Sequence, residues 1–110
     1  MTTHKTATGH IELLDQWGHG KAAKADYAKR PATLISDDGD GHFCAWAVTG
    51  DMRDAAKTAA SFNLRNDGRY VAEIDGNTVS MVYPSTDFWM ETEDGDFVPN
   101  LEKYPNVVAY

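Results

Sequence analysis

The chain has a single cysteine, Cys44, so no disulfide can form within it. Unpaired cysteine is typical of proteins in a reducing compartment. An apolar run of about 18 residues, which a membrane-spanning helix needs, is missing as well. The first ten residues, MTTHKTATGH, lack the apolar stretch of a secretory signal peptide. We therefore expect a cytoplasmic protein that does not enter a membrane.

Basic residues are few. Ten Lys and Arg stand against 17 Asp and Glu, which gives a formal net charge of −7. The imbalance lies after residue 30, because residues 31–110 hold fourteen of the acidic side chains and five of the basic ones. Such a charge repels nucleic acid and anionic lipid and attracts a basic protein surface. Acidic side chains also favour solubility, which is the alternative explanation.

Patterns of known metal or catalytic sites are missing too. Residues 36–42 (SDDGDGH) are similar to a calcium loop, but an EF-hand starting at Asp38 needs Gly at position 6 and Glu at position 12, where Phe43 and Thr49 stand. Cys44 and the four histidines lack the short paired spacing of a zinc site. The sequence therefore predicts no metal ion and no cofactor. These histidines are His4, His10, His19 and His42.

What the sequence does contain is a pair of apolar runs around an acidic loop. Residues 32–36 and 42–48 flank a loop, residues 37–41, of three aspartates and two glycines. This pattern predicts a β-hairpin. Both faces of the return strand are apolar, so we expect an interior strand covered on both sides. Small side chains at Ala45 and Ala47 would let a helix approach one of these faces closely.

The rest of the chain predicts one domain, residues 1–110, with residues 1–9 flexible. Asp51 as N-cap and an apolar face predict that the approaching helix covers residues 51–63. The fold class is therefore α+β: a mostly antiparallel sheet of about five to six strands, built from hairpins, packed on this central helix, with a short helical N-terminal segment. The other predicted elements are helices over 10–17 and 21–29, a turn at 66–68, hairpins over 69–84 and 88–98, and an extended segment at 107–109.

Carboxylates gather at the ends of two predicted hairpins. If the hairpins stack in one sheet, both ends lie along one edge and present spaced negative charge, as a phosphate backbone does. Trp89 would add an apolar anchor beside them. The alternative is that acidic turns only deter pairing between sheet edges. The predicted partner-binding residues are Asp37, Asp38, Asp40, Trp89, Glu91, Glu93, Asp94 and Asp96.

These features favour a non-enzymatic interaction protein: a small acidic inhibitor that binds and blocks a basic, nucleic-acid-binding surface of a larger protein. In size, acidity and lack of a catalytic motif the chain is similar in type to phage-encoded inhibitors of host defence, including anti-CRISPR proteins. We expect no direct contact with nucleic acid. Whether the chain forms a homodimer is left open by the sequence. The alternative hypothesis is a small-molecule-binding protein or small enzyme with a pocket near His42, Cys44, Trp46 and Tyr70.

Overall fold

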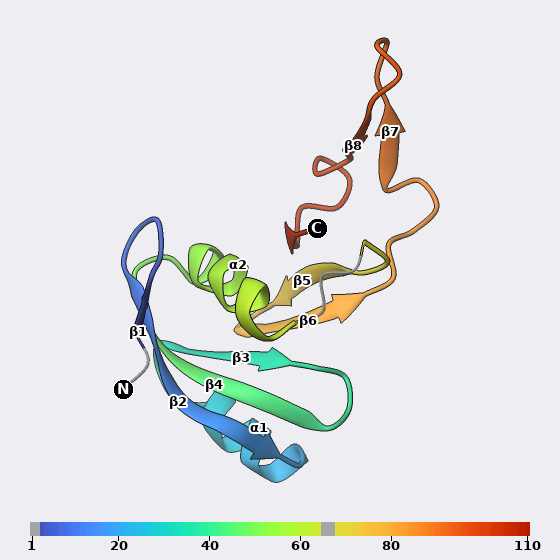
Figure 1. The fold of residues 1–110 in the computed structure, drawn as a ribbon. Coiled ribbons are helices and arrows are strands. Elements are labelled where there is room, and N and C mark those ends of the chain that lie inside the picture. The colour runs from blue at the N-terminus through green and yellow to red at the C-terminus, as the bar shows by residue number, and fades with distance from the viewer. Residues whose placement is uncertain (1–2, 65–67) are drawn as a thin grey trace.

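The computed structural model describes residues 3–64 and 68–110, and within them the fold is dominated by β-strands (Figure 1). Seven strands form one curled sheet, a half-barrel, and two more form a separate small sheet. The order in the large sheet is β1-β2-β4-β3-β6-β5-β9. In chain order the elements are β1 (Thr3–Lys5), β2 (His10–His19), α1 (Lys21–Ala28), β3 (Thr33–Asp37), β4 (His42–Thr49), α2 (Met52–Asn63), β5 (Val71–Asp75), β6 (Thr78–Val82), β7 (Trp89–Glu91), β8 (Phe97–Pro99) and β9 (Val107–Ala109).

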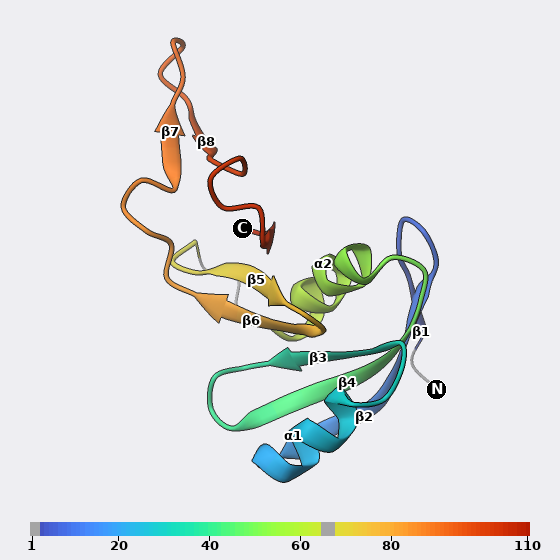
Figure 2. The same cartoon turned by 180° about the vertical axis from the view of Figure 1, so that it is seen from behind.

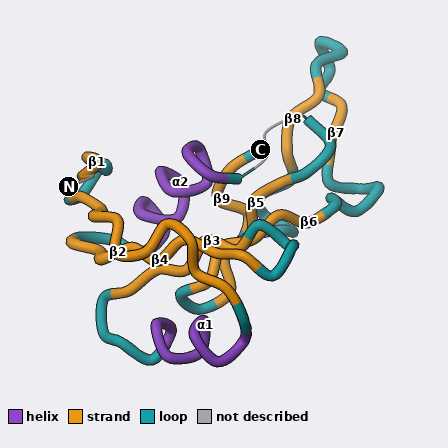
Figure 3. The backbone as a smooth tube through the Cα atoms, turned by 60° about the horizontal axis from the view of Figure 1, so that its bottom comes forward, coloured by secondary structure: helices purple, strands orange, loops and turns teal. Residues whose placement is uncertain are grey.

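The predicted fold class was wrong. In place of a mostly antiparallel sheet of five to six strands on one central helix, the large sheet has seven strands and is mixed. β3 and β6 run parallel, with Ile35 opposite Thr78. β4, α2 and β5 form the crossover between them, which a parallel pair requires (Figure 3). The hairpin β7–β8 does not join this sheet. α1 and α2 lie on opposite faces of the strands β2 and β4 (Figure 2).

The predicted helix over residues 10–17 was also wrong, because these residues belong to β2. β2 pairs antiparallel with β4, and the register shifts between Leu13 and Asp15 and again between Asp15 and Gly18. Each shift places an extra residue on β2, which is a β-bulge. The bulges break the alternation of a regular strand, and the apolar residues at the helical spacing do not share one buried face, since Ile11 is buried but Leu14 is 45% exposed. Trp17, assigned to the buried stripe of that helix, is 77% exposed.

β4 is an interior strand covered on both faces, as predicted. The helix expected on the face of Ala45, however, lies on the opposite face, and α1 takes its place. Ala45 and Phe43 pack against α1, with Tyr27 at the contact. The other face, with Cys44 and Trp46, packs under α2 in the main core. The face with the smallest side chains therefore receives the short helix α1, and α2 sits on the face with the large Trp46 because four buried alanines line it: Ala55, Ala56, Ala59 and Ala60.

Most of the local elements were predicted correctly. The hairpin over residues 32–48 is β3–β4, the helix over 21–29 is α1, and the hairpins over 69–84 and 88–98 are β5–β6 and β7–β8. The carboxylate of Asp51 accepts from the N–H of Arg53 at 2.8 Å and caps α2, and β9 forms the last extended segment. In the turn predicted at residues 66–68, Asn66 and Asp67 lie outside the described residues.

The segment before β2 contains a strand that was not predicted. Thr3–Lys5 forms β1 and pairs antiparallel with the start of β2. In the turn between them the Gly9 N–H donates to the Thr6 hydroxyl at 3.0 Å. The flexibility expected of residues 1–9 stays a prediction. Neither α1 nor α2, the helices of the described part of the chain, has the length and apolar content needed to cross a bilayer.

Candidate functional site

The two groups of carboxylates predicted as one binding edge lie apart. Asp37, Asp38 and Asp40 lie at the β3–β4 turn of the large sheet, whereas the others lie on the separate β7–β8 hairpin. Figures 1 and 2 show this hairpin projecting away from the body, with its turn far from the β3–β4 turn. The hairpins do not stack in one sheet, so the structure does not form the expected continuous acidic edge.

The carboxylates of the β3–β4 turn are largely engaged within the protein. Asp37 pairs with the Nζ of Lys24 and accepts from the Gly39 N–H at 2.8 Å. Partial burial acts to raise the pKa of Asp37, but these two hydrogen bonds outweigh it, and the pKa is lowered. Asp38 accepts from the Asp40 N–H at 2.9 Å. Asp37 and Asp38 thus hold the turn and leave Asp40 as its exposed carboxylate.

The β7–β8 hairpin, residues 89–99, we call the arm. Its turn is a three-residue loop with a bulge: Gly95 has φ +86 and donates its N–H to the Thr92 carbonyl at 3.0 Å. The Thr92 N–H donates in turn to the Asp96 carbonyl at 2.7 Å. Only glycine adopts this φ without strain. The loop therefore holds a compact acidic tip whose carboxylates are all exposed: Glu91, Glu93, Asp94 and Asp96.

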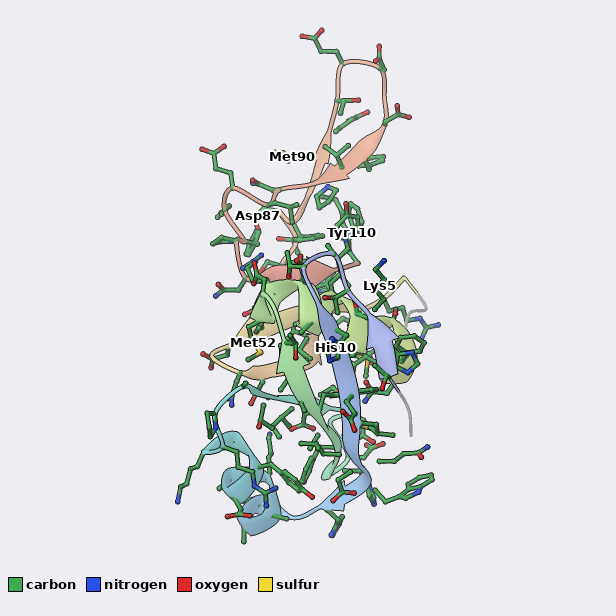
Figure 4. The ribbon with its side chains drawn as sticks, turned by 90° about the vertical axis from the view of Figure 1, so that its left-hand side faces the viewer. Lys5, His10, Met52, Asp87, Met90 and Tyr110 are labelled. Atoms are coloured by element: carbon green, nitrogen blue, oxygen red, sulfur yellow. The ribbon has the colours of Figure 1, made fainter. Side chains whose placement is uncertain are left out.

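Apolar side chains line both faces of the arm below this tip. Trp89 and Phe97 stand on one face, because Trp89 pairs with Pro99 and Phe97 with Glu91. Met90 and Val98 pair on the opposite face. Trp89 is partly covered, because its ring meets that of Tyr110 edge-on at 6.0 Å, and it keeps 40% of its surface exposed, whereas Phe97 is 64% exposed. Figure 4 shows Met90 on the projecting hairpin, well away from Met52 of α2.

The base of the arm is fixed to the body. Phe88 is 1% exposed and packs with Val71 of β5 and Val107 of β9. The carboxylate of Asp87 accepts from the Nζ of Lys103 and from the hydroxyl of Tyr104. These hydrogen bonds lower the pKa of Asp87. The arm thus starts from a packed aromatic anchor, and its exposed part begins directly after it.

The alternative pocket is found in part. Two adjoining cavities lie between β2, β4 and the end of α2, and Cys44 lines both. The larger, about 360 Å³, includes His42, and the smaller, about 200 Å³, includes Trp46. Tyr70 lines a different hollow, beside Ala72 of β5. The structure therefore brings together three of the four predicted pocket residues.

The Cys44 thiol is not an activated nucleophile. Burial raises the pKa of Cys44; a hydrogen bond with Ser36 opposes this shift, and the negative charges of Asp38 and Asp15 add to it. The thiol donates to the Gln16 carbonyl at 3.5 Å. A thiol with a raised pKa stays protonated at neutral pH, and the thiolate is the reactive form.

Two residues of these cavities were missed from the sequence. Gln16 was assigned to a helix, and nothing in the sequence distinguishes Asn63 from other polar residues at a helix end. The Oδ1 of Asn63 is buried and has no hydrogen-bond partner in the part of the chain that the structure describes. Within residues 3–64 and 68–110 no group of three or more His, Cys, Asp or Glu side chains is arranged to hold a metal ion.

Comparison with protein-family models finds no match, and comparisons with curated proteins and with solved structures also find none. The arm and the cavities beside Cys44 are therefore interpreted from their own geometry and chemistry.

Proposed function

We propose that this protein is a non-enzymatic interaction protein whose arm binds a basic surface of a larger protein. The observation that carries the proposal is the exposed arm: an acidic tip on a largely exposed apolar stem that projects from the body. A two-stranded hairpin alone is marginally stable in water. Apolar side chains exposed together on such an element are typical of interaction sites.

The two parts of the arm would act differently in binding. The four carboxylates of the tip attract a basic surface and speed the encounter. Trp89 and Phe97 stand behind them on one face and supply aromatic area, which anchors many interfaces. A nucleic-acid-binding surface offers the required cations, and an arm seated there would exclude phosphates. We therefore propose inhibition by occupation, the activity of the phage-encoded defence inhibitors to which the chain is similar in type.

The proposed interface is narrower than the set predicted from the sequence. It keeps Trp89 and the four carboxylates of the tip and omits the β3–β4 turn, because Asp37 and Asp38 are engaged within the protein. Homodimers through the arm are disfavoured, because two acidic tips repel each other. We propose that binding takes place in the cytoplasm, where the single cysteine stays reduced.

A charge-matched pair of variants tests the proposal. Glu93→Lys/Asp94→Lys on the arm and Asp40→Lys/Asp75→Lys elsewhere each change the net charge from −7 to −3. Each protein is used to capture partners from a lysate at low and high salt, and association and dissociation rates of the captured protein are measured with and without competing DNA. We expect the arm variant to associate at least about tenfold more slowly at low salt, and the control to bind as wild type.

Trp89→Ala separates the anchor from the charge. It should speed dissociation with little dependence on salt, because burial of apolar area is not screened. Melting temperatures should stay within the error of wild type for the charge variants, since exposed single charges contribute little to stability. If both charge variants lose binding equally, the loss comes from the change in net charge alone, and this result would contradict a role for the arm.

A further inference from the structure

Two histidines that lie far apart in the sequence face each other on neighbouring strands. His19 ends β2 and His42 begins β4, and the two residues are directly opposite in the antiparallel pairing. In the next pair the Gly20 N–H donates to the Gly41 carbonyl at 3.3 Å. Because hydrogen-bonded and non-hydrogen-bonded pairs alternate along an antiparallel ladder, His19 and His42 form a non-hydrogen-bonded pair, in which side chains approach most closely.

The separation of the two imidazole rings matches that of two ligands on one metal ion. Their centroids are 4.7 Å apart, and the rings are tilted by 49° instead of stacking in parallel. With a metal–nitrogen bond of about 2.1 Å, the centroids of two bound imidazoles lie about 4.5 Å apart at a right angle and about 5.2 Å apart at the tetrahedral angle. The observed separation lies between these values, so both rings can reach one ion by side-chain rotation alone, without movement of the strands.

The surroundings of the pair determine which ions suit it. Both histidines are exposed and line a hollow of about 250 Å³, so an ion can enter from water. Of the other charged residues around this hollow, Asp37 pairs with Lys24, and Lys21 is exposed, so that water and salt screen its charge. The free ligands are therefore imidazole nitrogens, which suit Zn²⁺, Cu²⁺ and Ni²⁺, whereas Mg²⁺ and Ca²⁺ require oxygen ligands.

We propose that His19 and His42 together bind one divalent transition-metal ion such as Zn²⁺. Among residues 3–64 and 68–110 no group of three metal-ligating side chains exists, so this chain supplies two ligands and the other positions of the ion stay open to water or to a second molecule. The spacing of the histidines in the sequence does not indicate the pair, because it forms only where β2 meets β4. The site lies at the end of the sheet beside α1, away from the arm, so its occupation does not depend on the function proposed above (Figure 1).

Titration of the full chain with ZnCl₂, followed by NMR of the imidazole rings, tests this proposal. Zn²⁺ is diamagnetic, so each histidine ring reports its own binding. His10 is the internal control, because it is also exposed and lies on β2, but it has Thr49 opposite it in β4. MgCl₂ at the same concentrations is the control for divalent charge.

We expect Zn²⁺ to shift the ring signals of His19 and His42 together and saturably, with the same midpoint, and Mg²⁺ to shift neither. The melting temperature should rise with Zn²⁺, since an ion that binds only the paired strands stabilises the folded chain. Zn²⁺ binding should weaken as the pH is lowered, because protons compete for the same nitrogens. No saturable shift, a shift of one ring alone, or an equal effect at His10 would overturn the proposal.

Three matched variants locate the ligands. His19→Gln and His42→Gln should each weaken Zn²⁺ binding at least about tenfold, whereas His10→Gln should bind as wild type. All three side chains are exposed, so the melting temperatures without metal should stay close to that of wild type. Wild-type affinity for Zn²⁺ in either His19→Gln or His42→Gln would contradict the shared site.

Calorimetry and sedimentation of the wild type with Zn²⁺ show what completes the coordination. One ion per chain, with the mass of a monomer, assigns the open positions to water. One ion per two chains, with a dimer that forms only with Zn²⁺, assigns them to the same histidine pair of a second copy, which completes the four ligands of a tetrahedral site. Both outcomes support the pair, and a Zn²⁺-dependent dimer that persists in His19→Gln would overturn it.

Discussion

The indole Nε1–H of Trp46 donates to the hydroxyl of Ser36 at 2.9 Å, between two neighbouring strands inside the core. Ser36 is fully buried and Trp46 is 3% exposed, so water cannot replace either partner. Ser36→Ala leaves a buried indole N–H unpaired, and we expect the free energy of unfolding to fall by about 1–3 kcal/mol. Urea denaturation followed by tryptophan fluorescence measures this loss.

A double-mutant cycle is the control for this hydrogen bond. Trp46→Phe removes the N–H and keeps an aromatic ring, so Ser36→Ala in that background should cost clearly less than in wild type. Additive losses would show that the effect of Ser36→Ala comes from packing and not from the hydrogen bond.

Stability should depend on acid through Asp37. Because folding lowers the pKa of Asp37, the pair with Lys24 stabilises the fold above the ordinary aspartate pKa of about 3.9. That contribution is lost as the pH falls through the lower folded-state value. Asp37→Asn should therefore reduce the free energy of unfolding by roughly 1 kcal/mol at pH 7 and by clearly less at about pH 2.5. Urea titrations at both pH values check this, and a loss of equal size at both would exclude the ion pair as its cause.

Cys44 should behave as a packing residue. Cys44→Ala should lower the free energy of unfolding by roughly 1 kcal/mol and leave binding by the arm intact. Because burial raises the pKa of the thiol, alkylation of the native protein by iodoacetamide should be slow at pH 7 and faster as the pH rises. Mass spectrometry measures the rate, with the urea-unfolded protein as the reactive control. Rapid alkylation of native protein at pH 7 would revive the enzyme hypothesis.

The hairpins could be predicted because each turn is determined by a few neighbouring residues. Gly76 has φ +61 and the next residue, Asn77, has negative φ, as the predicted type II′ turn requires. Ile74 then faces Val79, and Ala72 faces Met81, as the predicted register has it. Such features depend on a few neighbouring residues, and the sequence contains all of them.

The sheet as a whole could not be predicted in this way. The spacing of Ile11, Leu14 and Trp17 in β2 is helical, and the two bulges form only where β2 pairs with β4, so the sequence does not reveal them. The second bulge ends at Gly18, which lies opposite Phe43 of β4. A Cβ at Gly18 would stand 2.4 Å from the ring of Phe43, so the close approach requires glycine there. The parallel pairing of β3 with β6 likewise depends on residues far apart in the chain, and no local pattern encodes it.

The candidate sites divide along the same line. The acidic tip and Trp89 are visible in sequence because they are one continuous segment. The larger cavity is assembled from β2, β4 and the end of α2, so Gln16, Cys44 and Asn63 come together only in three dimensions. The position of the two acidic turns relative to each other also depends on tertiary structure. The expectation that both turns lie along one edge of a single sheet was wrong, because β7 and β8 form a separate sheet.

The parallel pairing of β3 with β6 has a consequence for synthesis of the chain. β3 reaches its second neighbour only after the ribosome has added α2, β5 and β6. Until then one edge of β3 carries open backbone groups, including the Ile35 N–H, which donates to the Asn77 carbonyl at 2.8 Å in the finished fold. An open strand edge is a template for pairing with other chains. We therefore expect a nascent or truncated chain that ends before Asn77 to aggregate more readily than the folded full chain.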